Sequence, residues 1–232
     1  MAFEQNVAPL EMAPVSAAQN TNTVLRNTYW LTALAMLPMS LGAVVGSQIS
    51  FALLRSSPII GFFVMMAVLY GLMFAIQRNR TSGIGVVLLL LFSGVLGVIT
   101  GPLLQSVLSL RNGGSLIAFA AMGTGAVFFG MAAISSVVKR PLAGLGKFLT
   151  IGGIVLMIAV VANVFLQMPM FSLVISGLFI VFSSLAILWQ LNAIVTGGED
   201  NYISATLTLV VQIYNIFVSL LQLLGVFGGS RD

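Results

Sequence analysis

Neutral polar side chains recur at helical spacing near the C-terminus, and they are the residues of this chain best placed to do chemistry. Successive members are three or four residues apart, so a helix would carry them as one stripe among Leu, Val, Ile and Phe. The stripe consists of Asn201, Ser204, Thr208, Gln212, Asn215, Ser219 and Gln222. Amides and hydroxyls of this kind donate and accept hydrogen bonds without carrying charge. The stripe therefore predicts either hydrogen bonds between helices or the lining of a closed aqueous cavity.

A second, sparser stripe precedes the first along the chain. Its members, at spacings that keep one helix face, are Ser172, Ser176, Ser183 and Gln190. This face could lie opposite the first stripe across a helical bundle. The predicted polar core or gate consists of Gln190, Gln212, Asn215, Ser219 and Ser183.

Other catalytic and ligand-binding arrangements are largely excluded by residue type. The chain has no His and no Cys, which removes zinc peptidase motifs, His-based triads and thiol nucleophiles. Ser135 and Ser136 lie close enough to Lys139 for a Ser–Lys dyad. We interpret them instead as a helix end followed by a lysine in a loop. We expect no metal, no cofactor and no enzymatic activity.

The composition predicts a protein that lies within a lipid bilayer. Only 6% of the residues are charged and 59% are hydrophobic, whereas soluble domains carry roughly 25% charged residues. The apolar runs are long enough for helices, which need about 20 residues to cross the hydrocarbon layer. We therefore predict an all-α membrane protein with spans at Thr28–Ser50, Pro58–Ile76, Gly83–Leu108, Leu116–Val138, Phe148–Leu166, Phe171–Leu191 and Tyr202–Phe227.

The first 27 residues differ from the rest in being polar and interrupted by proline. A segment of this kind buries too little apolar surface to offset its ordering entropy. We therefore predict two parts: a disordered tail over residues 1–27 and a seven-helix bundle over residues 28–232. The tail lacks the basic start of a signal peptide, so we expect the first span to remain as an anchor.

The distribution of lysine and arginine predicts the orientation. Six lie on the side of the N-terminal tail (Arg26, Arg78, Arg80, Lys139, Arg140 and Lys147) and three on the other side (Arg55, Arg111 and Arg231). The side richer in basic residues faces the cytoplasm. The N-terminus is then cytoplasmic and the C-terminus periplasmic. Because the basic residues flank spans rather than forming a patch, we expect no nucleic-acid binding.

Small residues in the spans predict close helix packing. Four pairs have the four-residue spacing that places both members on one helix face and lets helix backbones approach. These pairs are Gly42 with Gly46, Ala67 with Gly71, Gly97 with Gly101, and Ala126 with Gly130.

Several segments resemble the Bax inhibitor-1 family, over a region from about Val24 to the C-terminus. They are Val24–Tyr29 (VLRNTY), Tyr70–Phe74 (YGLMF), Gly101–Leu104 (GPLL), Ala162–Gln167 (ANVFLQ), Gly197–Ile203 (GGEDNYI) and Tyr214–Leu221 (YNIFVSLL). The last two are the most specific, because a loop and a long helix match together. The resemblance is closest to the family's bacterial inner-membrane branch, which modulates the FtsH protease.

The resemblance implies a fold in which six helices surround the last one. It also implies a partner, the membrane-anchored protease FtsH with its associated membrane complex. Some family members are proton-sensitive calcium leaks that use two aspartates, in the sixth and seventh spans. The matching positions in this chain are Gln190 and Gln212. Glutamine does not titrate and supplies no negative charge to a cation.

Two functions from different classes follow from these features. The first is an integral inner-membrane protein that binds FtsH and modulates its degradation of membrane proteins. Its N-terminal tail, from Ala2, Phe3, Glu4, Gln5 and Asn6 onward, would be the segment that the protease recognises. The alternative is an ion leak, of the calcium type, along the polar stripe.

Overall fold

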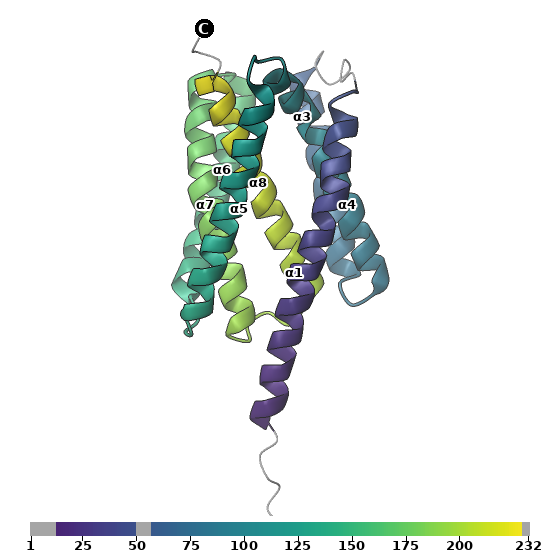
Figure 1. Ribbon diagram of the computed structural model, residues 1–232, viewed down its shortest axis with the longest axis vertical. Coiled ribbons are helices and arrows are strands. Elements are labelled where there is room, and N and C mark those ends of the chain that lie inside the picture. Colours follow the sequence, from purple (N-terminus) through teal and green to yellow (C-terminus); the bar gives the residue numbers. More distant parts are fainter. Residues whose placement is uncertain (1–12, 50–56, 229–232) are drawn as a thin grey trace, which may run out of the picture.

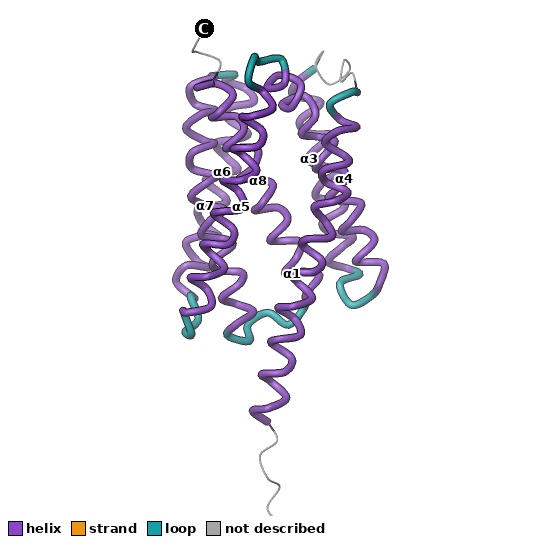
Figure 2. The backbone as a smooth tube through the Cα atoms, in the orientation of Figure 1, coloured by secondary structure: helices purple, strands orange, loops and turns teal. Residues whose placement is uncertain are grey.

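Seven long helices make up the computed structural model, which describes residues 13–49 and 57–228 (Figure 1). No strand occurs in this described part, and short loops join the helices (Figure 2). All seven helices are long and apolar enough to cross a membrane, as the sequence predicted. In chain order they are α1 (Ala13–Gly46), α3 (Pro58–Arg78), α4 (Gly83–Leu108), α5 (Gly113–Val137), α6 (Ala143–Leu166), α7 (Pro169–Val195) and α8 (Tyr202–Gly228).

The first helix begins earlier than the sequence predicted. Residues 13–27, expected to be part of a disordered tail, are helical and continuous with the first span. Ala13, Ala17 and Ala18 are strong helix formers, and extending an existing helix needs no new nucleation. In Figure 1 the first turns of α1 extend beyond the ends of the other helices. The predicted recognition residues 2–6 lie outside the described residues.

The last helix occupies the centre of the bundle. No residue of α8 from Tyr202 to Gly225 is exposed, although a membrane helix at the periphery would expose one face to lipid. α8 contacts α1, α3, α4, α5 and α7. The remaining helix, α6, packs against α7 and α3, and none of its Cα atoms lies within 8 Å of one in α8. The polar stripe of α8 is therefore enclosed by the other helices.

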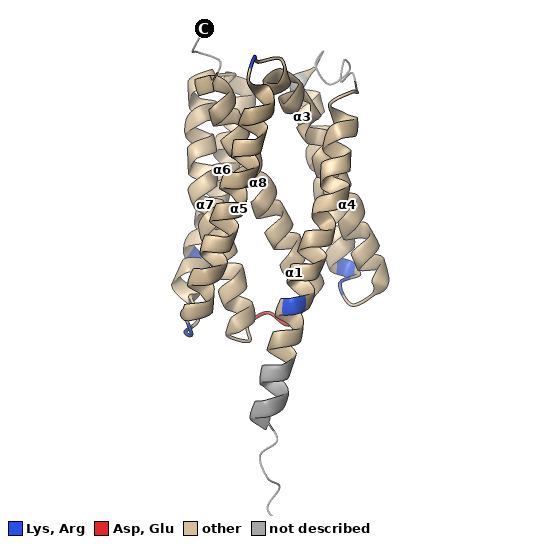
Figure 3. Ribbon diagram, viewed as in Figure 1, with Lys and Arg blue, Asp and Glu red and all other residues tan. Residues whose placement is uncertain are grey.

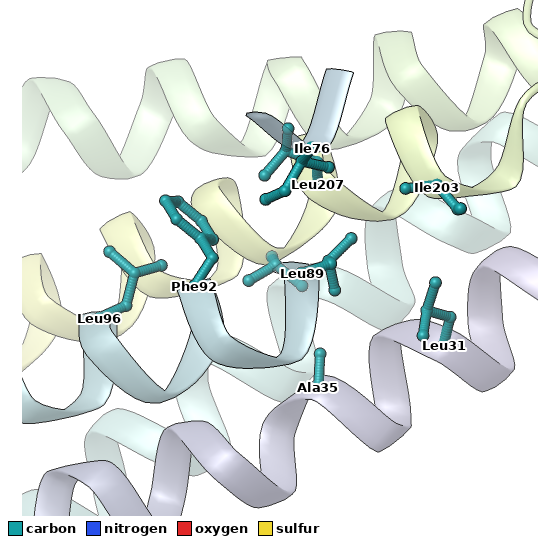
Figure 4. Packing of buried hydrophobic residues seen from close by; sticks show 9 residues of the cluster. Leu31, Ala35, Ile76, Leu89, Phe92, Leu96, Ile203 and Leu207 are labelled. Atoms are coloured by element: carbon teal, nitrogen blue, oxygen red, sulfur yellow. The ribbon is translucent and has the colours of Figure 1, made fainter. Parts of the chain in front are cut away.

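The main apolar core joins the two ends of the chain. Leu31 and Ala35 of α1 pack with Leu89 and Phe92 of α4, and Leu207 of α8 lies in the same cluster (Figure 4). Ala35, Leu89 and Phe92 are at most 1% exposed. Burial of this kind fixes the position of α1 against both α4 and α8.

Glycines bring α1 and α4 into backbone contact, the most extensive contact between any two described helices. A Cβ atom added at Gly46 would overlap the backbone of Val98, and one added at Gly97 would overlap the carbonyl of Met39. The packing predicted for the pairs Gly42 with Gly46 and Gly97 with Gly101 is confirmed. Gln105 of α4 adds a side-chain cap, donating from Nε2 to the Ser47 carbonyl at 2.6 Å.

The other two small-residue pairs do not pack as predicted. Ala67, Gly71, Ala126 and Gly130 are all exposed, and a Cβ atom added at Gly71 or Gly130 would meet no atom within 4 Å. Spacing places two small residues on one face, but it does not determine whether that face meets a helix or lipid. These two pairs lie on the outer surface of the bundle.

Charged residues gather at one end of the bundle, where α1 begins (Figure 3). Arg26, Arg78, Arg80, Lys139, Arg140 and Lys147 are all exposed there. At the opposite end, Arg111 is the one basic residue within the described part of the chain. We call these the basic end and the opposite end. The distribution matches the asymmetry from which the orientation was predicted.

Side-chain amides hold the loops of the basic end. Asn192, 1% exposed, donates from Nδ2 to the Val138 carbonyl at 2.8 Å and accepts from the Leu142 amide at 3.1 Å. Asn201 caps α8 by accepting from the Ile203 and Ser204 amides, and its Nδ2 donates to the Arg80 carbonyl at 2.8 Å. These bonds satisfy groups that helix ends would leave without partners.

Candidate polar site

The polar stripe of α8 begins with two structural contacts at the basic end. The Ser204 hydroxyl donates to Oε1 of Gln77 on α3 at 2.9 Å. The Thr208 hydroxyl donates to the Ser204 carbonyl of its own helix at 3.2 Å. Ser204 thus forms a hydrogen bond between helices, the first of the two interpretations left open by the sequence, whereas the Thr208 hydroxyl bonds within its own helix.

A hydrogen-bonded cluster joins α7 and α8 near the opposite end. The Ser176 hydroxyl donates to Oε1 of Gln222 at 2.8 Å, and Nε2 of Gln222 donates to the Ser172 hydroxyl at 2.6 Å. Both serines belong to the second stripe, so the expectation that the stripes of α7 and α8 face each other is confirmed here. A single glutamine thereby links two successive turns of α7.

Between these two regions the stripe lacks hydrogen-bond partners. Ser183 Oγ, Gln190 Nε2 and Gln212 Oε1 are buried, and none has a hydrogen-bond partner within the described chain. Gln190 and Gln212 therefore do not bond to each other through these atoms. Because buried polar groups normally find partners, the middle of the bundle retains capacity for hydrogen bonding that the protein itself does not fill.

A cavity of about 290 Å³ opens beside the Ser172–Ser176–Gln222 cluster. Its walls come from α3, α6, α7 and α8, and Asn215 and Ser219 of the predicted core line it. The cavity thus separates α6 from α8. Three members of the α8 stripe, Asn215, Ser219 and Gln222, therefore line a cavity, and the interpretation of that cavity as closed and aqueous stays a prediction. Ser183, Gln190 and Gln212 do not line it.

The structure adds one polar residue that the stripes did not include. Asn163, near the end of α6, lines the cavity, and its buried Oδ1 has no partner in the described chain. On α6 it is a single polar residue in an apolar run, so no periodicity indicated it. Its place inside a predicted span, where an unpaired amide is costly, and its position in the segment Ala162–Gln167 that resembles the family were the two signals in the sequence.

The serines considered for a Ser–Lys dyad form other bonds. The Ser135 hydroxyl donates to the Ala132 carbonyl at 3.0 Å, and the Ser136 hydroxyl donates to the Ala133 carbonyl at 2.7 Å. Lys139 is exposed. Over the residues that the structure describes, no group of three or more His, Cys, Asp or Glu could hold a metal ion.

Comparison with known proteins identifies the family. The family model described as inhibitor of apoptosis-promoting Bax1 matches residues 21–229. An uncharacterized protein of Neisseria meningitidis is 44% identical over 205 residues, which cover 88% of this chain and 90% of the relative. The modulator of FtsH protease YccA of Escherichia coli is 41% identical over 213 residues, 92% of this chain and 93% of the relative. An uncharacterized protein of Pseudomonas aeruginosa is 40% identical over 228 residues, 98% of this chain and 97% of the relative. A seven-helix membrane protein with this match over most of its length belongs to the Bax inhibitor-1 family.

Proposed function

We propose that this protein lies in the bacterial inner membrane, binds the membrane-anchored protease FtsH and modulates its degradation of other membrane proteins. The observation that carries the proposal is the 41% identity, over nearly the full length of both chains, to a relative named as a modulator of this protease. The same relative in another Escherichia coli strain is named an inner membrane protein. The geometry of α1 supplies a mechanism.

The N-terminal segment is suited to be gripped by an ATP-driven protease. The first turns of α1 extend beyond the other helices at the basic end (Figure 1), and Asn20, Asn22 and Thr23 are exposed. In the proposed orientation this end faces the cytoplasm. Residues 1–12 precede the helix, and we propose that the protease engages Ala2–Asn6 there.

The contact between α1 and α4 then opposes extraction. A pull on the N-terminus acts first on α1, which is held by backbone contact at Gly42 and Gly46. Removing α1 would also expose the core formed by Leu31 and Ala35. Easy recognition combined with slow unfolding would keep the protease occupied, and other membrane substrates would be degraded more slowly.

The orientation is tested by single cysteines, because the chain has none of its own. We expect a cysteine at Gly144 to be protected from a membrane-impermeant thiol reagent added to cells with a permeable outer membrane. A cysteine at Asn112, an exposed residue at the opposite end, should be labelled. The reverse pattern would place the N-terminal segment outside the cytoplasm, where FtsH-driven extraction from that end could not begin.

Deleting residues 2–12 tests the proposed handle. We expect the variant to insert and unfold thermally like the parent, because the deletion ends before α1 begins. Its half-life in cells that contain FtsH should lengthen, and it should approach the half-life in cells that lack the protease. The matched control replaces the same segment by an unrelated polar sequence of equal length, which should restore turnover if the protease requires only a polar segment of this length. An unchanged half-life after deletion would contradict recognition at this segment.

An ion leak is the second candidate, supported by the cavity that Asn215 and Ser219 line. All five Asp and Glu residues of the chain lie outside the seven spans, so a calcium ion would have to cross on neutral ligands. Calcium flux into liposomes that contain the purified protein decides between the two. A flux that depends on pH would favour the leak.

A further inference from the structure

A second cavity adjoins the first along the bundle. It has a volume of about 480 Å³ and shares Phe179 and Asn215 with the cavity described above. We call the first the polar cavity and the second the apolar cavity. Helices α3, α6, α7 and α8 contribute residues to both. Phe179 and Asn215 therefore lie between the two cavities, and each volume is close to or within the range of small-ligand sites, roughly 300–1,000 Å³.

The two cavities differ in what they can bind. The polar cavity presents Asn163, Ser172, Ser176, Ser219 and Gln222. The apolar cavity is lined largely by aliphatic and aromatic side chains, and the hydroxyl of its Thr150 is already bonded to the Gly146 carbonyl at 3.0 Å. Polar side chains are therefore more numerous in the first cavity, although the walls of both are mostly apolar, and an amphipathic occupant fits this arrangement.

The mouth of the polar cavity lies at the depth of the lipid ester region, whereas Gln222 and Ser219 lie deeper, six and nine residues from the end of α8, or about 9 and 13.5 Å. Asn163 is three residues from the end of α6 and Ser172 three residues from the start of α7, or about 4.5 Å along each axis. The interfacial layer on each side of a bilayer is roughly 5–7 Å thick. Asn215, which is shared by both cavities, lies 13 residues from the end of α8, or about 20 Å deep. The mouth lined by Asn163 and Ser172 is therefore at the depth of a lipid glycerol, and the deeper part of the two cavities is at the depth of an acyl chain.

Hydrogen-bonding capacity in the polar cavity is unfilled and uncharged. Asn163 Oδ1 is buried and has no hydrogen-bond partner in the described chain, and the Ser219 hydroxyl lies nearby on a residue only 5% exposed. No charged residue lines either cavity. These groups match hydroxyls and ester carbonyls, whereas a buried phosphate would require cations or several amide donors.

The apolar cavity is open to the bilayer on its side. Tyr70 of α3 and Ile154 and Ile158 of α6 line the apolar cavity, and all three are more than half exposed. A chain could enter sideways between α3 and α6 without crossing the bundle. A helix of a partner protein is about 10–12 Å in diameter with its side chains, so it would need a broader groove than an acyl chain does.

We propose that these two cavities bind one membrane glycerolipid from the leaflet at the opposite end. The glycerol and ester groups bond to Asn163 and the Ser172–Gln222 cluster at the mouth, and one acyl chain extends past Phe179 to Phe182 and Met157. Any phosphate group stays outside, in the interface. The site does not depend on the proposed action on FtsH.

Photo-crosslinking tests the lipid site in the intact protein, reconstituted in nanodiscs of phosphatidylethanolamine and phosphatidylglycerol. The probe is a phosphatidylethanolamine with a diazirine in the middle of one acyl chain. A parallel experiment uses a diacylglycerol probe that has the same diazirine-labelled chain. We expect crosslinks concentrated at residues 153–158 of α6 and 179–182 of α7. Labelling by both probes places the phosphate outside the cavity, and labelling by diacylglycerol alone identifies a neutral lipid.

Two variants separate a specific site from general contact with lipid. In Gly153→Leu the new side chain starts 3.3 Å from the Phe182 ring and fills the apolar cavity, so crosslinking there should fall to the level of exposed faces. Its control is Gly130→Leu, at an open position on α5. Asn163→Leu should reduce labelling by a probe whose diazirine is next to the glycerol, with thermal unfolding checked for each variant. Three results would overturn the proposal. Labelling of the cavities could match that of the exposed faces, it could remain unchanged in Gly153→Leu, or crosslinks to another polypeptide could take its place.

Discussion

Replacing Gly97 by alanine is expected to shorten the half-life of this protein in membranes that contain FtsH. The new Cβ atom would overlap the backbone carbonyl of Met39, so α1 and α4 must separate. Overpacking of this kind costs about 1–3 kcal/mol, and such a loss would speed extraction roughly 5- to 150-fold if it falls on the unfolding barrier. Pulse-chase measurement of the protein with and without FtsH gives the two half-lives.

Gly94→Ala is the matched control for this experiment. Gly94 lies on the same helix, three residues away, and an added Cβ atom there would meet Pro38 at an ordinary contact distance of 3.7 Å. Its half-life should stay close to that of the parent. If Gly97→Ala destabilises the purified protein but leaves turnover unchanged, the contact between α1 and α4 does not limit extraction.

Replacing both Gln190 and Gln212 by aspartate is expected to make the bundle sensitive to pH. Gln190 is 3% exposed and Oε1 of Gln212 is buried, and burial disfavours the charged form of a carboxyl group. Stability gained from the protonated carboxyls is then present at acidic pH and lost as the pH rises and they ionise. Each pKa unit by which burial raises the pKa of such a carboxyl group corresponds to about 1.4 kcal/mol of free energy. The distance between spin labels at Val181 and Val226 should therefore change between pH 5 and 8 in the variant only.

The control variant has the same change, glutamine to aspartate, at two exposed positions. Gln48 and Gln167 are both exposed, so the double variant Gln48→Asp and Gln167→Asp adds two carboxyl groups without burying them. Its label distance should remain constant, as should that of the parent, which has no His and no acidic residue within its spans. A distance that varies with pH in the parent would show that groups outside the spans control the bundle.

The helices could be predicted closely because lipid imposes a simple requirement on sequence. A span must be apolar over its length and satisfy its backbone internally, and the predicted bounds of Gly83–Leu108 coincide with α4. The start of α1 was not predictable in this way, since residues 13–27 are polar yet helical. Composition indicates whether a segment can be buried, but it does not show whether a neighbouring helix will extend through it.

The site was predicted in part. The stripes indicated which faces of α7 and α8 meet, and the bonds from Ser172 and Ser176 to Gln222 bear this out. Helix periodicity did not predict the place of Asn163 in the polar cavity or the existence of the apolar cavity, because both depend on how α6 lies relative to α8. Likewise, Gly71 and Gly97 have the same spacing to a small neighbour, but only Gly97 faces another helix. Helix periodicity specifies a face, and tertiary arrangement decides what that face meets.

The most direct test of the proposed function is the rate at which purified FtsH degrades a membrane substrate in proteoliposomes, with and without this protein. We expect the rate to fall as the protein is added. Inhibition should weaken in Gly97→Ala and persist in Gly94→Ala, because only the former loosens α1. A substrate degradation rate that stays the same at every concentration of the protein would contradict the proposal that it modulates FtsH.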